Sequence, residues 1–121
     1  MKKQYLYAAI KKEKIAIIKL LLTHKSIDIN AINIIIKDDN KNSFDKKKIA
    51  LYEDVCIGNI QIIKLLLENK DIDVNIINTI AEWTEYESEY RLYWIYEQTA
   101  LSRAVKKRNI EVVKLLMTDS R

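Results

Sequence analysis

One pattern, written three times along the chain, constrains the fold more than any other feature. Residues 15–30 begin IAIIKLLLTHK and end in Asp-Ile-Asn, residues 60–75 begin IQIIKLLLENK and end in Asp-Val-Asn, and residues 110–119 read IEVVKLLMTD. Self-similarity at a spacing of tens of residues is typical of arrays in which each unit buries its apolar face against its neighbours. We therefore expect the chain to fold as a stack of three units.

Each unit contains a second, shorter run upstream of the first. Residues 6–10 (LYAAI), 51–55 (LYEDV) and 101–105 (LSRAV) occupy equivalent places, and each is followed by a short polar turn. Each unit is thus predicted to be two helices and an extended tail, with the first pair over about 4–12 and 15–24. The second helices are apolar almost all round except for one polar stripe, which predicts helices packed between other helices. That stripe contains Lys19, Lys64 and Lys114.

In combination these motifs resemble the ankyrin repeat. The resemblance rests on residues 99–105 (TALSRAV), Gly58-Asn59, residues 112–116 (VVKLL) and Asp73-Val74-Asn75. The sequence departs from the family pattern in having no proline at the start of the first helix and no glycine after the second. A threonine opens the first helix only in the third unit.

The resemblance implies a mainly α fold, an ankyrin-repeat α-solenoid of three helix pairs with two long β-hairpin-like finger insertions. It implies a single domain over residues 1–121, with repeats at about 4–30, 49–75 and 99–121 and finger insertions at about 31–48 and 76–98. Helix is then expected to exceed strand by about three to one.

Composition narrows the classes of function. The chain of 121 residues has one cysteine, one histidine and one glycine, so neither a disulfide framework, a zinc cluster nor a glycine-rich phosphate loop is expected. The formal net charge is only +4, and the basic clusters at 11–14 and 106–108 lie where cations favour a helix C-terminus. The apolar run 15–22 is short and contains a lysine. We expect no enzyme activity, cofactor, metal, nucleic acid or membrane, and a location in the cytoplasm or alternatively the nucleus.

Asp54 breaks the apolar pattern of the first helices. It aligns with Ala9 and Ala104, where the family keeps a small residue so that helices can touch. A carboxylate there must reach a partner or raise its pKa, and removing it is expected to stabilise the protein. Sequence drift in a tolerant array is the alternative to a specific role.

The first insertion reads as strand, turn, strand. Asp38, Asn40 and Asn42 have the opening spacing of a calcium loop, but Ser43 replaces the required glycine and Ile49 the closing glutamate. Calcium binding is therefore not predicted.

The second insertion holds both tryptophans and most of the tyrosines, around a polar tip at 85–89. Such residues favour a long β-hairpin. A turn centred on residues 87–88 would pair Trp83 with Leu92, Ala81 with Trp94 and Ile80 with Ile95. Strict alternation would then place successive side chains of the second strand on opposite faces of the hairpin. The first face would carry Tyr90, Leu92, Trp94 and Tyr96, and the second Arg91, Tyr93 and Ile95.

The function implied by the resemblance is a non-enzymatic scaffold that binds another protein through the concave helix face and the fingers. Aromatic side chains are enriched at interface hot spots, so the second finger is the predicted site. The predicted partner-binding residues are Trp83, Tyr86, Tyr90, Arg91, Tyr93, Trp94 and Tyr96. The alternative is that these aromatic residues only hold the hairpin together.

Two further readings stay open. The first is an enzyme that uses carboxylates near the hairpin tip, at Glu82, Glu85, Glu87 and Glu89. The second is a structural fragment of a longer array, or a self-associating scaffold that covers the apolar flank of its third unit with another copy.

Overall fold

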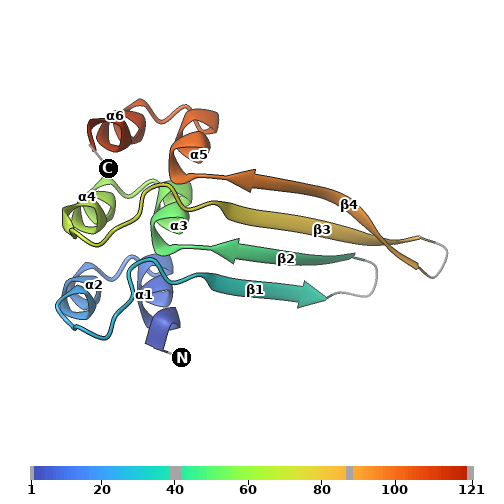
Figure 1. Ribbon diagram of the computed structural model, residues 1–121, viewed down its shortest axis with the longest axis horizontal. Coiled ribbons are helices and arrows are strands. Elements are labelled where there is room, and N and C mark those ends of the chain that lie inside the picture. Colours follow the sequence, from blue (N-terminus) through green and yellow to red (C-terminus); the bar gives the residue numbers. More distant parts are fainter. Residues whose placement is uncertain (1, 39–41, 87–88, 120–121) are drawn as a thin grey trace.

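The computed structural model describes residues 2–38, 42–86 and 89–119, and for residues 2–4 and the outer parts of both hairpins it describes the backbone only. Within these residues there are six helices and four strands. The helices form two rows, with α1, α3 and α5 beside the strands and α2, α4 and α6 on the far side (Figure 1). The helix bounds are α1 Lys2–Lys11, α2 Ile15–Leu22, α3 Ala50–Ile57, α4 Ile60–Glu68, α5 Ala100–Lys106 and α6 Ile110–Thr118.

The helices form where the repeated runs predict them, and three of them, α4, α5 and α6, begin at a side-chain cap. The side chains of Asn59 and Asn109 accept hydrogen bonds from the backbone N–H groups at the third residue of α4 and α6. Thr99 caps α5 in the same way. These caps satisfy N–H groups that have no partner within a helix.

The core lies between the two helix rows and between successive units. α1 packs on α3 and α3 on α5, so that the middle pair is covered on both sides. Leu51, Ile62 and Ile63 are fully buried there, while Lys19 and Lys64 lie on the predicted solvent stripe and are exposed.

The tails after α2 and α4 are held by polar side chains, as the Asp-x-Asn motif predicts. Asp28 and Asp73 each accept a hydrogen bond from the backbone N–H two residues later, at 2.9 Å. Asn30 also bridges to the next unit, since it donates to the carbonyl oxygen of Asp71 and accepts from the N–H of Asp73, both at 2.7 Å.

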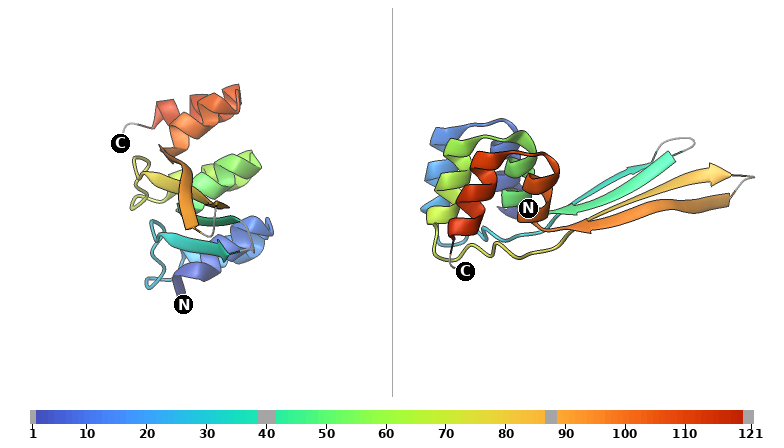
Figure 2. Two further views of the ribbon diagram at one scale, coloured as in Figure 1. Left: turned by 90° about the vertical axis from the view of Figure 1, so that its right-hand side faces the viewer. Right: turned by 90° about the horizontal axis from the view of Figure 1, so that it is seen from above.

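The strands form one antiparallel sheet in the order β1-β2-β3-β4. The strands are β1 Asn33–Asp38, β2 Asn42–Lys48, β3 Asn78–Tyr86 and β4 Glu89–Gln98. β2 pairs with β3 from Asn42 opposite Thr84 to Lys47 opposite Thr79, so the two hairpins are hydrogen-bonded to each other. The sheet projects away from the helix stack, on the side of α1, α3 and α5, and its outer part has no helix beside it (Figures 1 and 2).

The expected fold class, a mainly α solenoid with two separate fingers, is therefore wrong. The chain is a mixture of helices and a four-stranded antiparallel sheet. The strands are six, seven, nine and ten residues long and the helices seven to ten, so helix does not exceed strand three to one.

A match of spacings explains why the hairpins join. Packed helices lie about 8–10 Å apart, which sets the step from one unit to the next. Two strands of a sheet occupy about 9.5 Å. One hairpin per unit therefore fills one step of the helix stack, and neighbouring hairpins meet at hydrogen-bonding distance.

Candidate functional site

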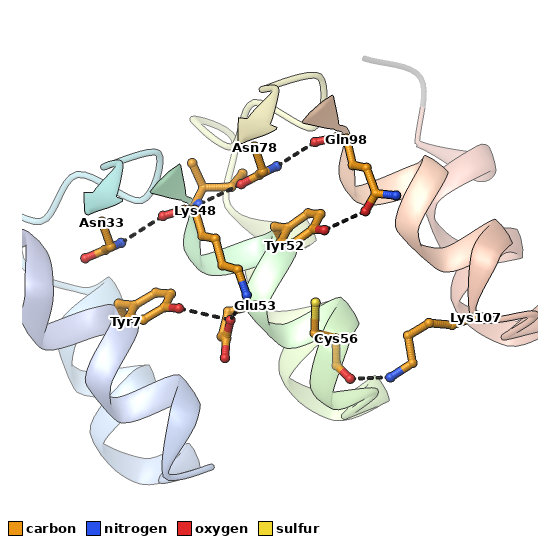
Figure 3. A network of polar contacts seen from close by, with 10 residues as sticks. Tyr7, Asn33, Lys48, Tyr52, Glu53, Cys56, Asn78, Gln98 and Lys107 are labelled. Atoms are coloured by element: carbon orange, nitrogen blue, oxygen red, sulfur yellow. Dashed lines mark hydrogen bonds and ion pairs between the residues drawn. The ribbon is translucent and has the colours of Figure 1, made fainter. Parts of the chain in front are cut away.

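Two asparagines at equivalent places in the repeat hold the base of the sheet, and one of them, Asn78, also bonds to a helix cap (Figure 3). Asn78, at the start of β3, donates to the carbonyl oxygen of Gln98 at 3.1 Å and accepts from the N–H of Ile49 at 2.8 Å. It thereby ties the beginning of one hairpin to the ends of both hairpins. Asn33, at the start of β1, donates to the carbonyl oxygen of Lys48 at 3.3 Å.

The two asparagines differ in one bond. Asn33 Oδ1 is buried and has no hydrogen-bond partner among the described residues. The residue of unit 1 that is equivalent to Ile49 is Gln4, which lies inside α1 instead of before it. The N–H that Asn78 finds at a helix cap is therefore not offered to Asn33.

Polar side chains also connect neighbouring units beneath the sheet. The Tyr7 hydroxyl donates to Glu53 Oε2 at 2.9 Å, and Lys48 Nζ contacts the same oxygen at 3.4 Å (Figure 3). Burial, together with the Glu53 carboxylate, raises the pKa of Tyr7 far above its ordinary value, so the hydroxyl stays a donor. The Tyr52 hydroxyl donates to Gln98 Oε1 at 2.6 Å.

Asp54 is fully buried in α3, between units 1 and 3, and neither carboxylate oxygen has a hydrogen-bond partner within the described part of the chain. Burial, followed by the charges of Glu13 and Glu53, raises the pKa of Asp54 from 3.8 to about 7. Of the two outcomes predicted for this carboxylate, the lack of a partner among the described residues leaves the raised pKa.

Three isoleucines on one face of the sheet are exposed, although Ala81 on the same face is only 4% exposed. Ile34 and Ile36 on β1 are 55% and 69% exposed, and Ile95 on β4 is 52% exposed. The register places all three on one face, because Ile36 is opposite Asp45, Asp45 opposite Ala81, and Ala81 opposite Ile95. We call this the isoleucine face. On the other face Ile80 is 5% exposed and Asn33, Asn78 and Gln98 are buried.

All the predicted partner-binding residues lie in the second hairpin. Trp83 and Tyr86 belong to β3, and Tyr90, Arg91, Tyr93, Trp94 and Tyr96 belong to β4. Their backbone positions are described, whereas their side chains lie outside the described part of the structure. The predicted turn at residues 87–88 also lies outside it.

The predicted register holds at the outer end of the hairpin and fails at the base. Trp83 pairs with Leu92 as predicted, but Ala81 pairs with Ile95 and Ile80 with Tyr96. The reason is an irregularity between Glu82 and Trp83, where β4 has one residue more than β3. Such a bulge adds one residue to one strand, and here the extra residue is Tyr93.

The bulge redistributes the aromatic residues between the faces, so the strict alternation predicted for β4 is wrong. Cross-strand partners belong to the same face. By this rule Trp83, Tyr90 and Leu92 belong to the isoleucine face. The opposite face carries four of the other predicted positions, Tyr86, Arg91, Trp94 and Tyr96, while Tyr93 is the bulge residue and has no cross-strand partner in the register.

Sequence reasoning missed Ile34, Ile36 and Ile95 as candidate site residues. Residues 34–36 are all isoleucine, so no alternation distinguishes an exposed face from a buried one. The exposed set could be found only once the cross-strand neighbours were known.

The remaining candidates are carried no further by the structure. The calcium-like segment includes residues 39–41, which lie outside the described residues. The same holds for Glu87, one of the carboxylates at the hairpin tip. Among residues whose side chains are described, no group of three His, Cys, Asp or Glu could hold a metal ion. Of the described helices, none has the length and apolar character needed to cross a membrane.

Comparison with known proteins gives no match from which a function could be assigned. No protein-family model matches the chain, and no curated protein sequence matches it.

Proposed function

We propose that this protein is a protein-binding module whose partner docks on the isoleucine face of the projecting sheet. The observation that carries the proposal is the exposure of Ile34, Ile36 and Ile95 on one face of a sheet that extends beyond its helices (Figure 2). Ile34 and Ile36 lie on the edge strand β1 and Ile95 on the opposite edge strand β4. Exposed apolar side chains on one face are typical of interaction sites. The ankyrin-like motifs support the same proposal, because proteins that carry them are scaffolds.

The polar residues on the isoleucine face suit a protein partner. Lys47 and Glu97 are exposed and lie in the cross-strand row of Ile34. Lys47 lies on the inner strand β2, between Ile34 on β1 and Glu97 on β4, so charged and apolar side chains are interspersed on this face. Protein interfaces commonly combine apolar contacts with polar ones in this way. The complementary partner surface presents apolar anchors flanked by charges of both signs.

The strand register also predicts which of the two tryptophans contributes more to partner binding. Trp83 belongs to the isoleucine face, and Trp94 to the opposite one. Loss of a central aromatic anchor costs about 2 kcal/mol of binding free energy or more. We expect Trp83→Ala to weaken partner binding by at least that amount and Trp94→Ala to weaken it less.

The test begins with a photo-crosslinking residue at position 36, so that captured proteins are those that contact the isoleucine face. The captured protein is then purified, and its Kd is measured by calorimetry for the wild-type protein, one triple variant and one double variant. The sheet variant is Ile34→Thr/Ile36→Thr/Ile95→Thr, which keeps β-branched residues in the strands. The control is Ile17→Thr/Ile110→Thr, which alters equally exposed isoleucines on the helices.

We expect the sheet variant to raise the Kd at least tenfold, about 1.4 kcal/mol, and the helix control to leave it unchanged. A Kd that is the same for the sheet variant and the wild-type protein would contradict the proposal.

A further inference from the structure

The two ends of the helix stack expose apolar side chains that the inner units bury. We call Tyr5, Ile17 and Leu20 the head flank, on α1 and α2. Val105, Ile110 and Met117 are the tail flank, on α5 and α6. These side chains are between 51% and 71% exposed. The two flanks lie at opposite ends of the stack (Figure 1).

Each tail-flank residue has buried or half-buried equivalents in the preceding units. Val105 is 56% exposed, whereas Ile10 and Val55 are 0% and 1% exposed. Ile110 is 70% exposed, while Ile15 and Ile60 are packed against the core. The same holds for Met117, whose equivalents are Leu22 and Leu67. The tail flank is therefore the surface that a unit buries against the unit after it.

The head flank shows the converse relation. Ile17 is 51% exposed, whereas Ile62 and Val112 are 0% exposed. Tyr5 is 55% exposed, whereas Ala50 and Ala100 are 2% and 1% exposed. The head flank is thus the surface that a unit buries against the unit before it.

The molecule consequently carries both halves of an interface that it already forms twice within itself. We propose that copies of this chain associate head to tail, with α1 and α2 of one copy packed on α5 and α6 of another. This contact uses the helix flanks and is separate from the isoleucine face.

The polar positions at the new contact are compatible with it. Inside the chain Tyr7 of one unit bonds to Glu53 of the next. At the contact between copies the equivalent residues are Ser102 of one copy and Ala8 of the other, so no charge is buried at that point. Lys12 occupies the position of Lys107, which donates to the carbonyl oxygen of Cys56 in the preceding unit (Figure 3). Lys12 is thus placed to donate to the corresponding carbonyl of the neighbouring copy.

One pair of positions is unfavourable and gives the association a salt dependence. Inside the chain Asn59 donates to Glu13 Oε1 at 3.0 Å. The corresponding residues at the contact between copies are Lys14 and Arg108, which are both basic. Screening of this repulsion strengthens the association as ionic strength rises.

The association is heterologous, since two different surfaces meet. It therefore builds assemblies of more than two copies, open rods or rings, whose mean mass rises with concentration, unlike a closed symmetric dimer. This difference allows a test with two complementary variants. Ile17→Lys places a charge on the head flank and Met117→Lys a charge on the tail flank, both at exposed positions that the fold does not need to bury.

Sedimentation velocity on the full chain, over concentrations from micromolar to about 1 mM, gives the expected result. The wild-type protein increases in mean mass with concentration, and more strongly at high salt. Each variant alone stays monomeric with an unchanged circular dichroism spectrum. An equimolar mixture of the two forms a heterodimer and nothing larger, because one intact head meets one intact tail. Ile36→Lys, on the isoleucine face, associates as the wild-type protein does.

Each other outcome overturns the proposal. Dimers of Met117→Lys alone would show head-to-head contact, and dimers of Ile17→Lys alone would show tail-to-tail contact. A wild-type protein that stays monomeric throughout, or an association that only Ile36→Lys abolishes, would show that the flanks do not bind another copy. None of these results bears on the partner affinity measured for the isoleucine face.

Discussion

The surroundings of Asp54 disfavour the ionised form of its carboxyl group. Its pKa is about 7 in the folded protein against 3.8 as a reference for the unfolded chain. Below about pH 4 the carboxyl is protonated in both states and costs nothing. Above about pH 7 it is ionised in both, and the shift costs roughly 4 kcal/mol at about 1.4 kcal/mol per pKa unit.

The folded state binds the extra proton between these limits, so the free energy of unfolding falls as pH rises from about 4 to about 7. Urea unfolding of the wild-type protein should show this fall. Asp54→Ala should remove most of the slope and be the more stable protein at pH 8. The control is Glu68→Ala, which changes an exposed carboxylate. A lower melting temperature for Asp54→Ala at pH 8 would show that the carboxylate is stabilised by its surroundings.

The turn between the two helices of each unit has the same backbone conformation in all three units. Glu13, Gly58 and Arg108 have φ values of 53°, 86° and 58°, and only the middle residue is glycine. A residue other than glycine pays about 1–2 kcal/mol in this left-handed region. The repeated position is therefore strained in units 1 and 3.

We expect Arg108→Gly to raise the free energy of unfolding by about 0.5–1 kcal/mol, after allowing for the greater freedom of glycine in the unfolded chain. Gly58→Ala should lower it by about 1 kcal/mol. The added Cβ would meet only Asn109 Nδ2, at 3.7 Å, so the loss comes from the backbone. Chemical denaturation of both variants checks the pair, and equal effects of the same sign would refute the explanation.

At the scale of elements, the asparagines at the strand starts decide how firmly each hairpin is attached. Asn78 bonds to Ile49, Ile76 and Gln98, whereas Asn33 bonds to Ala31 and Lys48. Asn78→Ala leaves a buried N–H and a buried carbonyl without partners, each at a cost of about 1–3 kcal/mol.

We therefore expect Asn78→Ala to lower the free energy of unfolding by about 3 kcal/mol, and Asn33→Ala by about 1 kcal/mol, because Asn33 lacks the bond to a helix cap. Urea denaturation of the two variants provides the comparison, with each serving as the matched control of the other. Equal losses would mean that the bond between Asn78 and Ile49 adds nothing.

The sequence predicted the elements better than their details. Helix positions followed from runs such as residues 60–68, in which period, cap and repeat agree. The hairpins followed from β-favouring residues flanking polar tips. The bulge at Tyr93 did not, because an extra residue in one strand leaves no compositional signal and moves every later side chain to the opposite face.

At the scale of the whole molecule, the fold class and the candidate site both depended on contacts that no single segment contains. The pairing of β2 with β3 arises because one hairpin fills one step of the helix stack. Residues 34–36 reveal a face only when β2, β3 and β4 lie beside them. The flanks of the stack, in contrast, could be inferred from the repeat itself, since each unit shows what its neighbours bury.

The continuous sheet also gives the molecule an uneven stiffness. Each unit is directly connected to at least one strand of it, so separating two units on that side means pulling hydrogen-bonded strands apart. On the side of α2, α4 and α6 the units touch chiefly through apolar side chains. Opening the stack on the side of the strands therefore breaks backbone hydrogen bonds such as those between β2 and β3, whereas opening it on the other side mainly exposes apolar surface.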